Sequence, residues 1–113
     1  MSIIEEFNKR RSSGNEKILS EEFLPYKRFF ALDKIAYQEG EIPRKYKELM
    51  GLVASTVLRC NDCIIYHIEQ CIQSGATRSE LNEALNIALV VGGSIIIPHL
   101  RVAYELIEEL FST

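Results

Sequence analysis

Helix start and stop signals recur along this chain, and they constrain its fold more than any other feature. Thr77 and Glu80 stand three residues apart, as in a capping box, and Gly75 lies where the preceding helix would end. Ser2 suits the N-cap of a first helix, and Pro43 suits the first turn of another. Apolar residues between these signals recur with the helical period. The sequence therefore predicts an all-α fold.

We expect a single-domain helical bundle of about six helices spanning residues 1–113, because a chain of 113 residues can sustain one core. Ser12–Asn15 weakens the first helix, and propensity alone does not decide whether it continues to Leu19. The remaining helices are expected from about Ser20 to before Gly40, from Pro43 to Leu58, from Asn61 or Asp62 to before Gly75, from Thr77 to Gly92, and from Ser94 to Phe111.

Two apolar segments are expected to be buried. Four aromatic residues lie between Phe23 and Phe30 and favour core packing. The third helix carries almost no charge from Leu49 to Leu58, so it should be buried on nearly every side, at the centre of the fold or in a subunit interface. A strand competes only at 88–98, but a lone hairpin would be marginal and a helix is preferred there.

Composition excludes several classes of protein. The net charge of −3 argues against a nucleic-acid partner. The apolar stretch 84–100 is interrupted and shorter than a comfortable membrane span, and the first residues lack the pattern of a secretory signal. We therefore expect a cytoplasmic protein. In a reducing compartment, two of three cysteines in one motif indicate redox or metal chemistry rather than a structural disulfide.

The chemistry is expected in Cys60-Asn61-Asp62-Cys63, followed by His67. A thiol attacks as its thiolate, and free N–H groups at a helix amino end stabilise that charge. The two-residue spacing also lets one cysteine attack and the other resolve the product. On a helix, Cys63 and His67 share a face about one turn apart, so His67 is placed to accept a thiol proton.

Zinc binding is the main competing interpretation, because Cys60, Cys63 and His67 are all metal ligands and His99 could complete a tetrahedral set. Structural zinc sites usually draw ligand pairs from two separated clusters, and the chain has no second pair of that kind. We therefore expect neither a metal nor another cofactor. Cys71, two turns beyond Cys63, is expected to be a small buried hydrophobic residue.

In the order in which they occur, three segments resemble the carboxymuconolactone decarboxylase family, in its alkylhydroperoxidase D-like branch. They are Glu48-Leu49-Met50-Gly51-Leu52-Val53, the Cys60-x-x-Cys63-x-x-x-His67 motif, and Gly75-Ala76-Thr77-x-x-Glu80-Leu81-x-Glu83-Ala84. The likeness covers a core of residues 41–110, while the N-terminal helices in 1–40 carry nothing diagnostic. It implies an all-helical fold and homo-oligomers, as trimers or hexamers.

The resemblance also implies residue roles. Cys63 would be the attacking thiol, Cys60 the resolving thiol, His67 the base acting on Cys63, and Glu48 the residue that orients His67. Twelve helical positions would put Glu48 roughly 18 Å from Cys60 along one axis. Glu48 must therefore reach His67 through an antiparallel hairpin of two helices, or reach the site of a neighbouring subunit. Otherwise it is an ordinary first-turn carboxylate.

Asp62 departs from the family pattern, because better-studied peroxidase-type members carry a histidine at this position. A carboxylate beside Cys63 opposes thiolate formation unless the Asp62 side chain is used to cap the helix.

We hypothesise an enzyme, a thiol peroxidase or disulfide reductase, in which Cys60 and Cys63 cycle between dithiol and disulfide. Its partners would be a peroxide or disulfide substrate and an unknown thiol reductant. The alternatives are a non-catalytic oligomerisation module with structural zinc, and a lactone decarboxylase-type enzyme using Glu48 and His67 without sulfur. The branch of the family that decarboxylates lactones lacks the cysteine pair, which counts against the last alternative.

Overall fold

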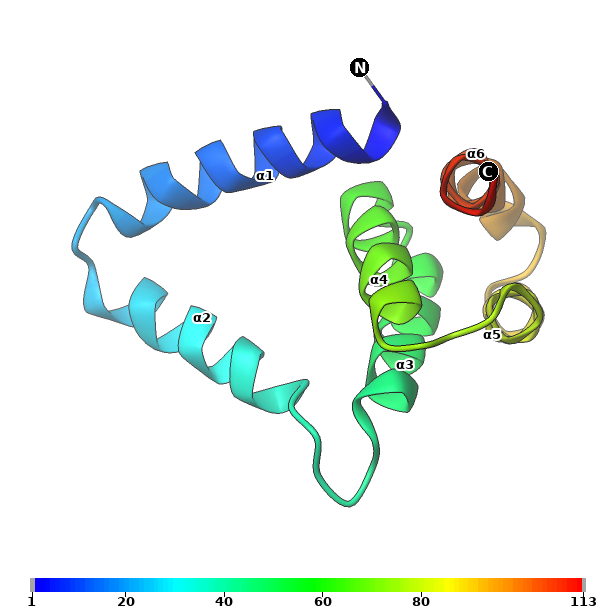
Figure 1. Ribbon diagram of the computed structural model, residues 1–113, viewed down its shortest axis with the longest axis horizontal. Coiled ribbons are helices and arrows are strands. Elements are labelled where there is room, and N and C mark those ends of the chain that lie inside the picture. Colours follow the sequence, from blue (N-terminus) through cyan, green and yellow to red (C-terminus); the bar gives the residue numbers. More distant parts are fainter. Residues whose placement is uncertain (1, 113) are drawn as a thin grey trace.

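The computed structural model describes residues 2–112, and every regular element in this part of the chain is helical, as predicted (Figure 1). In chain order these are α1 (Ile3–Leu19), α2 (Leu24–Ala36), α3 (Arg44–Val57), α4 (Asn61–Gln73), α5 (Arg78–Gly92), the short 3₁₀ helix η1 (Ser94–Ile96) and α6 (Ile97–Phe111).

Local sequence signals explain most helix ends. Two of the three expected start signals are confirmed, because Ser2 with Glu5, and Thr77 with Glu80, form complete capping boxes, whereas Pro43 is the N-cap of α3 and not its first helical residue. Gly75 follows α4 with φ +94°, a left-handed conformation that glycine adopts without strain. The helix α1 runs unbroken through Ser12–Asn15, so the weakening there does not end it.

Three boundaries differ from the expectation. Helix α2 begins at Leu24 after a turn in which Glu22 has φ 56°, rather than near Ser20. The N-cap of α4 is Cys60, not Asn61 or Asp62. The last helix opens with η1 before α6 begins at Ile97. Residue propensity specifies the ends of a helix less well than its existence, and all three differences lie at ends.

The core is formed where α3, α4, α5 and α6 pack together, with one end of α1 added. Helices α3 and α4 make the most extensive contact between elements and fold back along one another. Burial of apolar side chains between these helices supplies the main stabilisation of the bundle. The fully buried large aliphatic residues are Leu52, Ile64, Ile68, Leu81, Leu85, Ile96, Leu106 and Ile107.

Helices α1 and α2 form a V-shaped arm that projects from this bundle (Figure 1). Phe7 anchors α1 in the core, whereas α2 buries no residue at all. The prediction that the aromatic residues between Phe23 and Phe30 pack in the core is therefore wrong for the single chain: Phe29 is 66% exposed. The reason is that, among the helices of residues 2–112, α1 is the one against which α2 packs appreciably, and the contact is small, so most of the apolar side of α2 stays uncovered.

The prediction for the third helix is also only partly correct. Leu52 and Thr56 of α3 are completely buried, but Met50 is 53% exposed and Leu58, just beyond the helix end, is 78% exposed. Only the sides facing α4 and α5 are covered. Among residues 2–112, no helix has both the length and the apolar character needed to cross a membrane.

Glu109 of α6 holds the first turn of α1, because its carboxylate accepts hydrogen bonds from the backbone N–H groups of Ile3 and Ile4 at 2.8 and 3.1 Å. We predict that Glu109→Ala weakens this turn by about 1 kcal/mol and speeds hydrogen exchange of the α1 amides, measured by mass spectrometry. The control is Glu105→Ala, an exposed residue one turn earlier on α6. Equal exchange rates of the α1 amides in both variants would contradict this role of Glu109.

Candidate functional site

The two cysteines of the motif lie at the amino end of α4, as the sequence predicts. Cys60 is the N-cap residue in extended conformation, and its Sγ accepts the backbone N–H of Cys63 at 3.3 Å. Cys60 and Cys63 are joined in a disulfide across a Cα–Cα distance of 5.3 Å. The structure therefore corresponds to the oxidised form of the pair.

His67 and Glu48 form a buried pair between α4 and α3. Nδ1 of His67 lies 2.9 Å from Oε1 of Glu48, and the two residues are 8% and 1% exposed. A carboxylate only accepts hydrogen bonds, so Nδ1 carries a hydrogen, and whenever the ring is neutral its free lone pair is on Nε2. Of the two routes considered from the sequence, the structure has the antiparallel hairpin within one chain.

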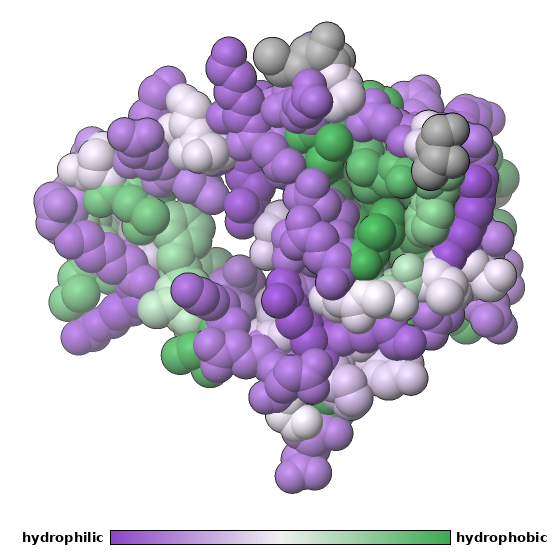
Figure 2. All heavy atoms as spheres, in the orientation of Figure 1, coloured by the Kyte–Doolittle hydropathy of each residue, from purple (hydrophilic) through white to green (hydrophobic). Residues whose placement is uncertain are grey.

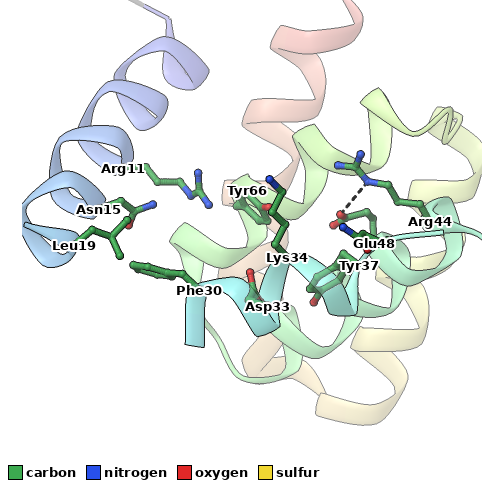
Figure 3. A pocket seen from close by; sticks show the side chains of 11 residues that line it. Arg11, Asn15, Leu19, Phe30, Asp33, Lys34, Tyr37, Arg44, Glu48 and Tyr66 are labelled. Atoms are coloured by element: carbon green, nitrogen blue, oxygen red, sulfur yellow. Dashed lines mark ion pairs between the residues drawn. The ribbon is translucent and has the colours of Figure 1, made fainter. Parts of the chain in front are cut away.

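Arg44 partly offsets the charge of Glu48. Its Nε lies 3.6 Å from Glu48 Oε2, one turn earlier on α3, and its guanidinium also donates to Gln70 at 2.6 Å (Figure 3). A buried carboxylate is costly unless it is paired and hydrogen-bonded. Glu48 therefore has one partner on each of its oxygens, a histidine inside and an arginine at the edge.

Tyr37, just after α2, completes the surroundings of His67. Its hydroxyl lies 3.5 Å from Nε2 of His67, and the two ring centres are 5.2 Å apart. Burial raises the pKa of Tyr37, and the negative charges of Glu48 and Asp33 raise it further, so the hydroxyl remains a hydrogen donor at neutral pH. Tyr37 thus faces the nitrogen that has the free lone pair.

Gly51 makes the close approach of these two rings feasible. A Cβ at this position would lie 2.7 Å from Cε1 of His67 and 2.7 Å from the hydroxyl oxygen of Tyr37. Sequence reasoning did not identify Tyr37, Arg44 or Gly51 as parts of the site. Glycine inside a helix costs about 1 kcal/mol relative to alanine, so its presence in the middle of α3 was the sequence feature that could have pointed to Gly51.

A cavity of about 410 Å³ opens beside Cys63 and His67, between α1 of the arm and α4. Tyr66 stands edge-on against His67 at a centroid distance of 5.0 Å, and the guanidinium of Arg11 covers Tyr66 at 4.3 Å. The other residues lining this cavity are Phe7, Arg10, Gly14, Asn15, Ile18, Asp33 and Asp62.

A second cavity, of about 590 Å³, continues along the arm toward Glu48 and Arg44 (Figure 3). Figure 2 shows the open gap between the arm and the bundle to which both cavities belong. The two share Arg11, Asn15, Asp33 and Tyr66 in their walls. We call them together the arm groove.

Asp62 does not cap α4. Its carboxylate instead pairs with Arg10 of α1 at 3.0 Å, and both side chains are more than half exposed. From the sequence, we expect the charge of Asp62 to be offset only if its side chain caps the helix. In the structure the guanidinium of Arg10, on the arm, offsets this charge instead. Such an exposed pair is weak and is screened by salt.

Cys71 and His99, the other residues considered as possible ligands, make contacts that stabilise the fold. Cys71 is completely buried, as predicted, and burial raises the pKa of its thiol to about 12, with Glu48 and Glu80 adding to the shift. Nδ1 of His99 lies 2.7 Å from Oδ1 of Asn61 and ties α6 to the first turn of α4. Within residues 2–112, no three His, Cys, Asp or Glu side chains are grouped so that they could hold a metal ion.

Comparison with solved structures identifies close relatives of the whole fold. Two crystal structures of one Thermotoga maritima protein match with TM-scores of 0.91 and 0.89, at 59% and 58% identity, covering 93% of this chain and 92% and 89% of theirs. One of them is described as a carboxymuconolactone decarboxylase family protein with a suggested involvement in antioxidative response. The apo form of a family member from Legionella pneumophila matches with a TM-score of 0.87, at 27% identity, covering 96% of this chain and 97% of its own.

Two relatives are similar in sequence. An uncharacterized protein of Cupriavidus necator is 35% identical over 65 residues, which span 58% of this chain and 58% of that relative. Uncharacterized protein 4 in the cox locus of Paracoccus denitrificans is 26% identical over 82 residues, 73% of this chain and 74% of its own. A sequence model of one family matches residues 25–105, most of the chain, and the chain belongs to that family, the carboxymuconolactone decarboxylase family.

Proposed function

We propose that this protein is a thiol oxidoreductase that reduces a peroxide or a disulfide by cycling Cys60 and Cys63 between dithiol and disulfide. One observation carries the proposal: the Cys60–Cys63 disulfide lies at the amino end of α4, and Cys63 shares a cavity with a histidine held by a buried carboxylate. The suggested antioxidative involvement of the Thermotoga maritima relative agrees with such chemistry.

The cycle begins with the reduced pair. Nε2 of His67 takes the proton of the Cys63 thiol, and the thiolate attacks one oxygen of a hydroperoxide. The O–O bond breaks, the alcohol leaves with a proton, and Cys63 becomes a sulfenic acid. The Cys60 thiol then attacks the Cys63 sulfur, which forms the disulfide and releases water. A cellular thiol reductant restores both thiols.

The groups around His67 act in this scheme by holding the imidazole. Glu48 fixes Nδ1–H and favours the protonated ring that forms after proton transfer, while Arg44 balances its charge. The Tyr37 hydroxyl donates toward Nε2 until the Cys63 thiol approaches. Arg10 offsets the charge of Asp62, which would otherwise oppose the thiolate of Cys63.

We also propose that the protein acts in the cytoplasm as a homo-oligomer, a trimer or hexamer. The uncovered side of α2 carries Leu32 and Ile35, which are 62% and 60% exposed, and α5 exposes Val90 and Val91 at 73% and 68%. Exposed apolar side chains on this scale are typical of protein interfaces.

Loss of Cys63 is expected to abolish the reaction. We predict that Cys63→Ser lowers hydroperoxide consumption with a dithiol reductant at least about 100-fold. Cys60→Ser, treated with peroxide in the absence of reductant, should retain a sulfenic acid at Cys63 without forming the intramolecular disulfide, and the buried Cys71→Ser should keep most of the activity. Consumption of cumene hydroperoxide measures all three variants. Equal rates for wild type and Cys63→Ser would refute the proposed function.

The same protein samples test the competing interpretations. One zinc ion retained per chain, measured by elemental analysis, would favour a structural metal module. Lactone decarboxylation that survives loss of both cysteines would favour sulfur-independent chemistry at Glu48 and His67.

Removing the charge of Glu48 is expected to slow thiolate formation. We predict that Glu48→Gln lowers the alkylation rate of Cys63 by about 10-fold or more, and that His67→Gln lowers it by about 100-fold or more, since general-base catalysis contributes this much. The measurement is alkylation by iodoacetamide in a Cys60→Ser background. Glu83→Gln, at an exposed position on α5, is the matched control. Circular dichroism must show unchanged helix content, and equal rates in Glu48→Gln and the control would remove Glu48 from the site.

A charge on the uncovered side of α2 is expected to break the assembly. We predict that Leu32→Glu lowers the mass measured by light scattering to that of a smaller species, because the carboxylate would be buried without a partner. Lys17→Glu, which reverses a charge at an exposed position of α1, should leave the mass unchanged. A wild-type mass equal to one chain would refute the oligomer.

A further inference from the structure

The arm groove is larger than hydrogen peroxide requires. Its compartment beside Cys63 alone measures about 410 Å³, and its walls combine apolar side chains such as Phe7 and Ile18 with charged ones. Cavities of this size hold small organic ligands, which are fixed by a few polar groups. The charged groups in the walls of the groove therefore help to determine which organic substrate binds there.

Most of these charges already have a partner. Arg10 is paired with Asp62, and Arg44 with Glu48. Among residues 2–112, Arg11 and Lys34 form no ion pair, and the only carboxylate of the groove that forms none is Asp33. The unpaired groups thus leave one positive charge in excess.

Arg11 is the unpaired cation next to the reactive group. It lines both compartments of the groove, whereas Lys34 lines only the one without Cys63. Its guanidinium covers the ring of Tyr66, which packs against His67 in a T-shaped arrangement, and Figure 3 shows the Arg11 side chain reaching from α1 to the Tyr66 ring. Stacking on Tyr66 directs the guanidinium while its N–H donors make no hydrogen bond in the described residues.

We infer that Arg11 recognises an anionic group, such as a carboxylate, on an organic peroxide or disulfide whose reacting bond lies at Cys63. The inference rests on the proposed function and specifies its substrate class. A guanidinium binds a carboxylate through two parallel N–H donors, which suits this role. Binding at Arg11 would leave the rest of the molecule in the compartment that contains Cys63 and His67.

The test uses two small disulfides of similar size, dithiodiglycolate, which carries carboxylates, and bis(2-hydroxyethyl) disulfide, which is neutral. The Cys63 thiolate attacks one sulfur of the probe, forming a mixed disulfide and releasing one thiolate. The Cys60 thiolate then displaces the second. The protein loses two electrons and two protons, and the probe becomes two thiols. Stopped-flow measurement on the reduced full chain gives the second-order rate for each probe.

The decisive quantity is the ratio of the two rates, anionic over neutral. Arg11→Gln is expected to lower this ratio about threefold to tenfold, as the loss of a partly exposed charge pair would. Lys9→Gln removes the same charge from an exposed position of α1 outside the groove and should leave the ratio unchanged. Asp33→Asn should raise the ratio, because this substitution removes a carboxylate that repels an anionic probe.

Two results would overturn the inference. If Arg11→Gln slows both probes equally, Arg11 has only a structural role. If Lys9→Gln lowers the ratio as much as Arg11→Gln does, the effect is that of overall charge. Failure of the proposed function is a separate result, in which the native wild-type protein reacts with neither probe faster than its urea-unfolded form.

Discussion

The hydrogen bond between Glu48 and His67 is the interaction on which the site depends. It joins α3 to α4 at a point where the carboxylate is almost completely buried. Removing one partner of a buried hydrogen bond leaves the other unsatisfied, which typically costs about 1–3 kcal/mol and more for a charged group, so neither residue can be exchanged freely. Helices α3 and α4, which carry the pair, pack together, and Leu52 on one and Ile64 and Ile68 on the other are completely buried in the core. Gly51 supplies the space that the imidazole occupies.

Much of the bundle could be predicted from the sequence because its signals are local. Capping boxes at Ser2 and Thr77 and the left-handed Gly75 act within a few residues, and the structure has all three. The helical spacing of Cys63 and His67 is equally local. The pairing of Glu48 with His67 needed the resemblance to a family as well, since two routes to it remained open on the residues alone.

What could not be predicted depends on contacts between distant segments. Nothing in the residues around Tyr37 indicates that it meets His67, thirty positions later, across the end of α2. The aromatic residues of α2 have the composition of a core, yet the arm leaves them uncovered. Apolar content predicts that a surface will be covered, but it does not say whether this chain or another molecule covers it. The arm groove is likewise a product of the angle between α1 and α2, which no short motif specifies.

The N-cap of α4 has a consequence for how the protein responds to its own chemistry. The Cys60 sulfur both accepts the N–H of Cys63 and forms the bond that is made and broken in the proposed cycle. The group that terminates the helix is therefore the group whose oxidation state changes. Every turnover would alter the first turn of α4, and with it the segment that Asn61 ties to His99 and Asp62 ties to Arg10. In this arrangement the contacts of the first turn of α4 with the arm and with the start of α6 lie between the two cysteines whose bond is made and broken.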